Sequence, residues 1–176
     1  MLGVIVVKIA GVVKNSIVDG PGFRYVIFVQ GCNHHCKGCH NPQTWNYNCG
    51  DDVSVSELID DIRETFSSNP MMRGLTLSGG EPLDKSDDLL ELVLGVKDIV
   101  KHIMIYSGYT LEEALVKGKE TPSIIKLLSN CDWMVDGEFE IEKRDLEQMY
   151  KGSSNQRVIN LNKFFETGDI VEIKFS

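Results

Sequence analysis

The stretch Cys32-Asn33-His34-His35-Cys36-Lys37-Gly38-Cys39-His40 places three cysteines at C-x3-C-x2-C spacing, shortly after the apolar run Tyr25-Val26-Ile27-Phe28-Val29. A strand that ends in a thiol-rich loop indicates a metal site at the edge of a sheet. The number of thiols is informative, because a closed structural zinc site or an ordinary [4Fe-4S] cluster takes four protein ligands. Three clustered cysteines supply three of the four iron ligands of a cluster and leave one iron open.

Zinc is the alternative metal for this loop. The side chains of His34, His35 and His40 are potential nitrogen ligands, and a Cys3His zinc site is chemically sound. Zinc modules usually present two separated pairs of ligands, whereas all the candidates here share one short loop. The spacing therefore favours an iron-sulfur cluster and leaves zinc open.

Outside this loop, apolar strands alternate with amphipathic helices. Strands are expected at residues 4–13, 24–30, 75–78, 102–106, 132–135, 157–161 (towards the sheet centre) and 170–175 (an edge). Two capping-box sequences, Ser54-Val55-Ser56-Glu57 and Thr110-Leu111-Glu112-Glu113, predict helix starts, and Pro122 predicts a third. Further helices are expected at 86–100 and, exposed, at 142–150. The first of these would bury Leu89, Leu90, Val93, Leu94 and Val100.

This alternation predicts an α/β fold with a mostly parallel sheet, in a single domain over residues 1–176. The chain is shorter than the ~200 to 400 residues of a complete eight-fold barrel, so an incomplete, open barrel is expected. Active sites of parallel α/β folds lie at the carboxyl ends of the strands. The cysteine loop, the turn Gly79-Gly80-Glu81-Pro82 and the turn Ser107-Gly108-Tyr109 should meet there.

The composition is that of an ordinary globular protein, with 42% hydrophobic and 25% charged residues. The formal net charge of -8 argues against nucleic acid or an anionic membrane as partner. Five cysteines, three of them within eight residues, suit a reduced thiol site better than a disulfide framework. Cys131 is expected in the core and Cys49 as a free thiol. Since no apolar run reaches the ~18 residues of a membrane helix, a cytoplasmic location is expected.

The cysteine loop, followed by Gly79-Gly80-Glu81-Pro82, resembles the radical S-adenosylmethionine (SAM) enzymes. The resemblance implies an open radical-SAM-type β/α barrel in which Cys32, Cys36 and Cys39 hold a [4Fe-4S] cluster. In that family SAM chelates the open iron through its amino and carboxylate groups. The reduced cluster then cleaves SAM into methionine and a 5'-deoxyadenosyl radical, which abstracts a hydrogen atom.

By the same resemblance, SAM would lie against the glycine-rich turn and the end of the cysteine loop. The turn lacks Cβ atoms that would block close approach to the methionyl ammonium, and the carboxylate after it would offer an anion nearby. The implied SAM-binding residues are Gly38, Cys39, His40, Gly79, Gly80 and Glu81. No side chain is identified as a catalytic acid or base, because the reagent comes from the cofactor.

Further stretches narrow the resemblance. Asp19-Gly20-Pro21-Gly22-Phe23-Arg24, Phe28-Val29-Gln30-Gly31-Cys32 and Cys39-His40-Asn41-Pro42-Gln43-Thr44-Trp45 resemble the glycyl-radical-enzyme activases. Val135-Asp136-Gly137-Glu138-Phe139 and Gly152-Ser153-Ser154-Asn155-Gln156-Arg157 resemble the branch that acts on anaerobic ribonucleoside-triphosphate reductase. The last stretch is also typical of a polar turn, and no catalytic role is assigned to its side chains.

The branch implies an oxidoreductase that generates a glycyl radical on the large subunit of that reductase. It also implies a one-electron donor such as flavodoxin. Two alternatives stay open. A pyruvate formate-lyase-type activase would share the cysteine loop but act on another partner. A non-catalytic zinc or iron-sulfur binding module would not need the glycine-rich turn.

Overall fold

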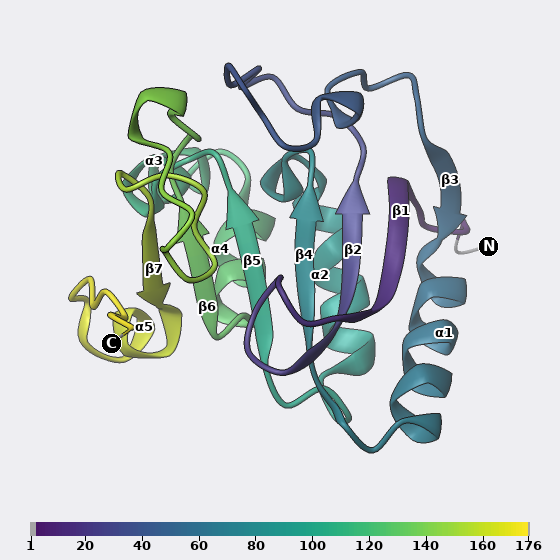
Figure 1. Cartoon of the computed structure of the whole chain (residues 1–176). Helices are drawn as coiled ribbons and strands as arrows, with labels where there is room; N and C mark the ends of the chain where they lie inside the picture. Colours follow the sequence, from purple (N-terminus) through teal and green to yellow (C-terminus); the bar gives the residue numbers. More distant parts are fainter. Residues whose placement is uncertain (1–2, 176) are drawn as a thin grey trace.

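A single open sheet of seven strands forms the centre of the computed structural model, which describes residues 3–175 (Figure 1). The strand order is β3-β1-β2-β4-β5-β6-β7. Strands β2, β4, β5 and β6 are parallel, while β1, β3 and β7 each pair antiparallel. The bounds are β1 Val6–Ser16, β2 Phe23–Val29, β3 Asp51–Ser54, β4 Met72–Gly79, β5 Ile103–Ser107, β6 Trp133–Asp136 and β7 Arg157–Asn160. An open α/β sheet with a parallel centre is therefore confirmed.

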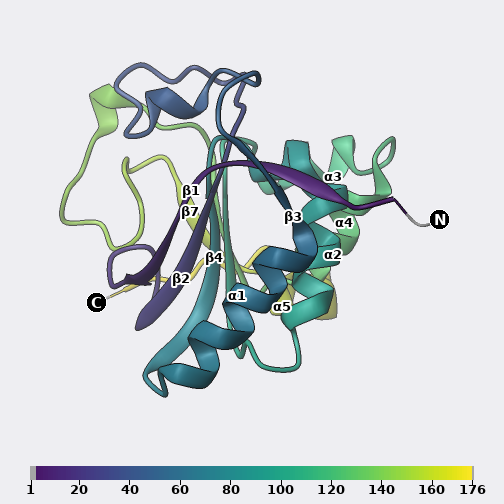
Figure 2. The ribbon, with the colours of Figure 1, turned by 90° about the vertical axis from the view of Figure 1, so that its right-hand side faces the viewer.

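Helices cover one face of this sheet (Figure 2). They are α1 Val55–Ser68, α2 Ser86–Val96, α3 Leu111–Lys117, α4 Pro122–Ser129 and α5 Leu161–Thr167. Both predicted capping boxes are confirmed, because Ser54 and Thr110 each accept the amide three residues on and that residue's glutamate returns the bond. Pro122 opens α4 as expected. Within residues 3–175, no helix combines the length and the apolar character that crossing a bilayer requires.

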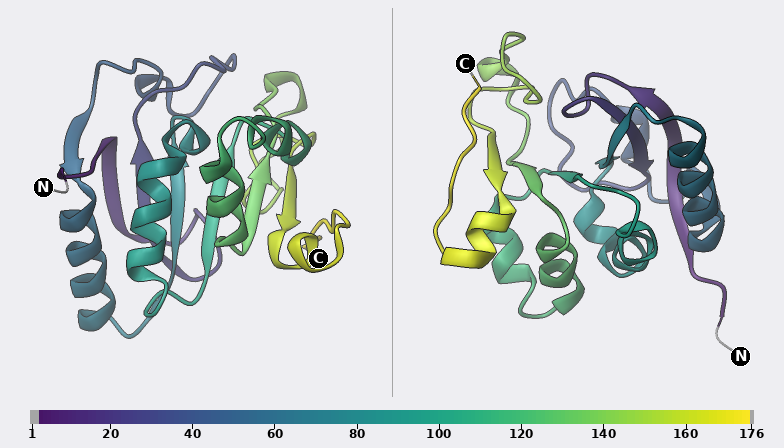
Figure 3. Two further views of the ribbon diagram at one scale, coloured as in Figure 1. Left: turned by 180° about the vertical axis from the view of Figure 1, so that it is seen from behind. Right: turned by 90° about the horizontal axis from the view of Figure 1, so that it is seen from below.

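The two faces of the sheet serve different purposes. Alternate side chains of a strand point to opposite faces, and in β2 the residues Tyr25, Ile27 and Val29 are fully buried in the core beneath the helices. Phe28 lies between two of them and faces the other side, where it borders a pocket. The views from behind and from below show the helix layer on one face and long connecting loops on the other (Figure 3).

Three expected elements are wrong. Residues 142–150 form no helix: a short 3-10 turn, Ile141–Lys143, leads into a loop in which Leu146 is 79% exposed. Leu146, Met149 and Tyr150 have helical spacing, but the first two stay exposed and Tyr150 takes a φ of 63°, so no packing against the sheet stabilises a helix here. Residues 170–175 form no strand and make one isolated bridge, from Glu172 to Ile159. β7 ends one side of the sheet order instead of lying near its centre.

The second expected helix is real but shorter. α2 ends at Val96, and Leu94 is 57% exposed instead of buried. The buried stripe runs through Leu89, Leu92, Val93 and Val96, which is the i, i+3, i+4, i+7 pattern of a single helix face. Strand β3 and helix α5 were not expected, because both are short and have few apolar residues.

Candidate functional site

The cysteine loop leaves the carboxyl end of β2 and lies across the edge of the sheet (Figure 1). Its base is fixed by two backbone bonds, from Gly31 N to Thr44 O (2.7 Å) and from Cys32 N to Trp45 O (3.1 Å). Cys32 is buried, while Cys36 and Cys39 are partly exposed. The loop therefore presents its three thiols at different depths.

One sulfur accepts a hydrogen bond from a backbone amide, that of Cys39 from Asn41 N at 3.4 Å. The backbone of His34 and His35 lies beside Cys32, and that of Phe139 lies beside Cys36, and in each case it lowers the pKa of the thiol. Burial raises the pKa of Cys32 to about 11 and raises that of Cys36, and these backbone groups oppose both shifts. Polar groups beside the sulfurs are a means by which proteins tune iron-sulfur clusters, so these surroundings fit one.

A pocket of about 400 Å³ lies beside these thiols. Phe28, Ser78 and Tyr106 line it from three neighbouring parallel strands. All three cysteines border it, as do His40 and the glycines at the end of β4. Among the residues described, no three His, Cys, Asp or Glu side chains already surround one point as a finished metal site would. Bonds to iron would have to draw the sulfurs together.

The glycine-rich turn after β4 packs backbone against backbone on the start of the cysteine loop. Gly80 N donates to Val29 O, and Glu81 N donates to Gly31 O, both at 2.8 Å. A Cβ added at Gly80 would lie 2.3 Å from the Gly31 carbonyl oxygen. Only glycine therefore lets the two turns meet at this distance.

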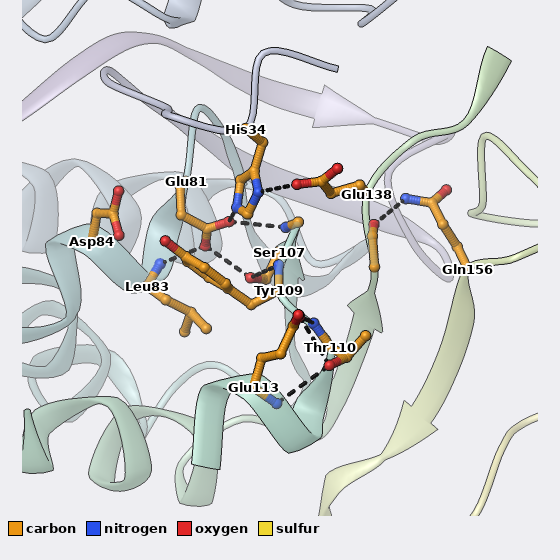
Figure 4. A network of polar contacts seen from close by, with 12 residues as sticks. His34, Glu81, Leu83, Asp84, Ser107, Tyr109, Thr110, Glu113, Glu138 and Gln156 are labelled. Atoms are coloured by element: carbon orange, nitrogen blue, oxygen red, sulfur yellow. Dashed lines mark hydrogen bonds and ion pairs between the residues drawn. The ribbon is translucent and has the colours of Figure 1, made fainter. Parts of the chain in front are cut away.

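Glu81 is fully buried beneath this contact (Figure 4). Its carboxylate accepts four hydrogen bonds at 2.9 Å, from Leu83 N, Ser107 Oγ, Gly108 N and His34 Nε2. Each of these groups belongs to the protein itself. The carboxylate ties together the ends of β4 and β5 and the cysteine loop.

His34 lies between two carboxylates. Its Nε2 meets Glu81 and its Nδ1 meets Glu138 at 2.7 Å (Figure 4). The hydrogen bond to Glu81, joined by that to Glu138 and opposed by burial, raises the pKa of His34 to about 9. Both ring nitrogens are thus engaged by carboxylates, so neither is directed at the thiols as a zinc ligand would be.

The buried side chain of Arg24 stabilises another segment that lines the pocket. Arg24 Nε donates to Thr76 Oγ1 at 2.9 Å and its Nη2 to Leu75 O at 2.5 Å. Burial lowers the pKa of Arg24 to about 10, so it stays charged at neutral pH. Thr76 Oγ1 in turn donates to Asp19 O at 2.7 Å. The start of β2 thereby fixes the turn whose residues Val18 and Asp19 border the pocket.

Comparison with known proteins places this arrangement in a family. Residues 18–159 match the family model described as a 4Fe-4S single cluster domain. The chain is 37% identical over 148 residues to the anaerobic ribonucleoside-triphosphate reductase-activating protein of Haemophilus influenzae, covering 80% of this chain and 90% of that protein. The chain belongs to this family of activating proteins.

Other activating proteins show the same degree of similarity. The one from Escherichia coli K12 is 35% identical over 153 residues, which is 83% of this chain and 94% of that protein. The one from Enterobacteria phage T4 is 33% identical over 150 residues, which is 81% and 87% of the two chains. The match to the 4Fe-4S domain model supports an iron-sulfur cluster, which the spacing of the cysteines also favours over zinc.

The structure brings most of the predicted site residues of this activating protein together. The pocket is bordered by Cys32, Cys36, Cys39, His40, Gly79 and Gly80. Gly38 and Glu81 are not among the described residues that line it: Gly38 contacts Ile141, and the Glu81 carboxylate is engaged inside the protein. Cys131 is buried in the core and Cys49 is an exposed free thiol, as expected.

Sequence reasoning missed the role of two residues. His34 was grouped with possible zinc ligands, and the turn containing Ser107 was placed at the site without a partner. Both are bonded to Glu81. The sequence shows only that Glu81 follows a predicted strand, and a single acidic residue in that position does not reveal which groups it contacts.

Gly80→Ala is expected to reduce the iron bound per chain several-fold. The added methyl would force the cysteine loop away from the turn, at the roughly 1–3 kcal/mol typical of overpacking. Iron and sulfide analysis after anaerobic reconstitution measures the effect. The matched control is Gly11→Ala, where an added Cβ meets nothing within 4 Å. Equal iron content in the two variants would contradict the close packing.

Proposed function

We propose that this chain is a single radical SAM domain over residues 1–176, with an open radical-SAM-type β/α barrel. In this proposal it generates a glycyl radical on the large subunit of anaerobic ribonucleoside-triphosphate reductase. The observation that carries the proposal is that three thiols and the Gly79-Gly80 turn border one pocket at the carboxyl ends of β2 and β4. Membership of the activating-protein family supports the choice of partner.

In this proposal, Cys32, Cys36 and Cys39 bind the cluster and leave one iron for SAM. When bound, the [4Fe-4S] cluster and SAM would supply one-electron reductive cleavage of a sulfonium, which is chemistry that can remove a hydrogen atom from glycine. The backbone of the glycine-rich turn faces the methionyl group, and His40 borders the same ligand. Glu81 acts from behind this turn, because its carboxylate holds the turn and the cysteine loop in register.

The partner's glycine must reach the pocket from solvent. Two loops are among the segments that line the pocket: the turn containing Val18 and Asp19, and the loop containing Tyr150 and Lys151. Neither belongs to a strand or helix. A polypeptide segment can approach the pocket between these two loops. In the same proposal, a flavodoxin-type protein is the external electron donor, and the cytoplasm is the location.

Electron paramagnetic resonance tests the proposal. The cluster-loaded protein, mixed anaerobically with reductant, SAM and the reductase, should produce a glycyl radical signal on the reductase. Omitting SAM should abolish the signal. An intact, reducible cluster that yields no glycyl radical would overturn the assignment.

Two further measurements separate the alternatives. About four irons with acid-labile sulfide per chain support the cluster, whereas one zinc per chain supports a binding module. Incubation with a pyruvate formate-lyase in place of the reductase should leave that partner without a radical. A radical on the lyase alone would assign the chain to the other activase type.

A further inference from the structure

Residues 137–141, here called the cover segment, lie against the cysteine loop from a distant part of the chain. The ring of Phe139 packs on the ring of His40, with centroids 5.1 Å apart. The side chain of Ile141 fills the space beside Gly38, where an added Cβ would lie 2.5 Å from Ile141 Cδ1. Gly38 has φ +77°, so both its backbone conformation and this contact require glycine.

The cover segment also reaches one of the sulfurs. The backbone of Phe139 lies beside Cys36 and lowers the pKa of its thiol, whereas the backbone groups beside the other two thiols come from within ten residues of them. The carboxylate of Glu138 adds the ion pair with His34. The polar groups around the sulfurs and their exposure to solvent are two of the factors that set the properties of a cluster. The cover segment, packed on His40 and beside Gly38, is placed to affect both.

Three polar side chains of the 152–157 stretch hold the cover segment by its backbone. The bonds run from Asn155 Nδ2 to Glu138 O (2.8 Å), from Gln156 Nε2 to Gly137 O (2.8 Å), and from Glu140 N to Ser153 Oγ (3.2 Å). Figure 4 shows the Gln156 amide reaching across to the chain that follows β6. Ser153 is fully buried. We call Ser153, Asn155 and Gln156 the clasp.

The clasp is more than a turn that closes on itself. Gln156 does close its own turn, because its Oε1 accepts the amides of residues 152 and 153. Its Nε2, however, is directed at the cover segment, as is the Nδ2 of Asn155. Arg157, at the start of β7, pairs with Asp136 at the end of β6 and with Glu112 in the first turn of α3. A local turn would not need bonds to three successive parts of another segment.

We infer that Ser153, Asn155 and Gln156 are positioning residues for the cysteine loop. They hold the cover segment in place, and the cover segment packs on His40 and Gly38 and shields Cys36 from solvent. The inference deepens the proposed function and rests on it in one respect, namely that Cys36 is a cluster ligand.

The test compares Asn155→Ala and Gln156→Ala with the wild-type full-length chain. In the metal-free protein, alkylation of Cys36 by iodoacetamide, followed by peptide mass spectrometry, should accelerate roughly three- to tenfold in Asn155→Ala, which loses one hydrogen bond. Gln156→Ala loses three and should react at least as fast. In the cluster-loaded protein, iron transfer to a chelator should accelerate by a similar factor, and the midpoint potential of the cluster should shift. The core residue Cys131 should stay unreactive throughout, which reports that the fold is intact.

Asn130→Ala is the matched control. Its Nδ2 also donates to a backbone carbonyl at 2.8 Å, that of Lys126, far from the cysteine loop. This variant should lose a comparable amount of stability while Cys36 keeps its wild-type reactivity. If Gln156→Ala does not fold, Ser153→Ala replaces it, since that variant loses a single longer bond.

A double variant separates positioning from independent effects. Phe139→Ala alone should accelerate Cys36 alkylation, and Phe139→Ala with Asn155→Ala should react no faster than the faster single variant, because both changes release the same cover segment from the cysteine loop. Multiplying rates would overturn the inference. So would wild-type rates of alkylation and iron loss in folded Asn155→Ala and Gln156→Ala. If the chain binds no cluster the proposed function fails, and alkylation of the metal-free chain still decides the role of the clasp.

Discussion

Cys36→Ala is expected to abolish activation of the reductase and to leave the protein without a stable cluster. Changing a residue that only supports a metal ligand costs roughly 10–100-fold in affinity or activity, and losing a ligand should exceed that. The expected activation is therefore below about a hundredth of the wild-type value. Iron and sulfide content, the visible absorption of the cluster and the glycyl radical yield measure the loss. Cys32→Ala and Cys39→Ala should behave alike.

Cys49→Ala is the control for this prediction. Cys49 is exposed and lies in a polar loop, away from the residues that line the pocket. Its variant should keep the wild-type iron content and radical yield. Full activation by Cys36→Ala, together with loss of iron in Cys49→Ala, would show that the ligand set is misassigned.

Glu81→Ala is expected to lower the free energy of unfolding of the metal-free chain by roughly 3–5 kcal/mol, the range for breaking a buried ion pair. The variant leaves the amides of Leu83 and Gly108 and the hydroxyl of Ser107 without their acceptor, and it removes one of the two anions beside His34. Chemical denaturation measures the change.

Two other variants help to interpret the stability change of Glu81→Ala. Glu81→Gln keeps the volume but lacks the charge, so a loss of about 1–3 kcal/mol is expected. Glu57→Ala removes an exposed capping carboxylate and should cost about 1 kcal/mol or less. If Glu81→Ala leaves the stability unchanged and instead weakens SAM binding, the carboxylate serves the ligand, as the family resemblance implies.

Much of the fold could be predicted because its signals are local. A capping box needs four neighbouring residues, and Ser54 and Thr110 both cap helices as expected. The uniformly apolar β2 is a central strand, as its composition indicates. The expected helix at 142–150 is wrong for the opposite reason: its helical spacing is local, but whether its apolar side chains find a partner depends on the rest of the fold, and Leu146 and Met149 stay exposed. The segment instead bridges to Ser153 through Arg144.

The candidate site also combines features that the sequence predicts with contacts that it does not. The cysteine spacing and the glycine-rich turn are contiguous motifs, and the topology of a parallel sheet brings their residues to one pocket. The partners of Glu81 and the bonds of the clasp join segments far apart in the sequence. The Gly152-Ser153-Ser154-Asn155-Gln156-Arg157 stretch could be connected to a family, but its contacts required the folded chain.

The contact between His34 and Glu138 spans 104 positions of the sequence. Contacts between such distant segments form late in folding, because the closure of a long loop precedes them. The cysteine loop, by contrast, joins residues that are close in the sequence, with its base bonded to Thr44 and Trp45. During synthesis the thiols are thus exposed well before residues 137–141 can close over them. Reagents in solution have their easiest access to these thiols while the last third of the chain is still unfolded.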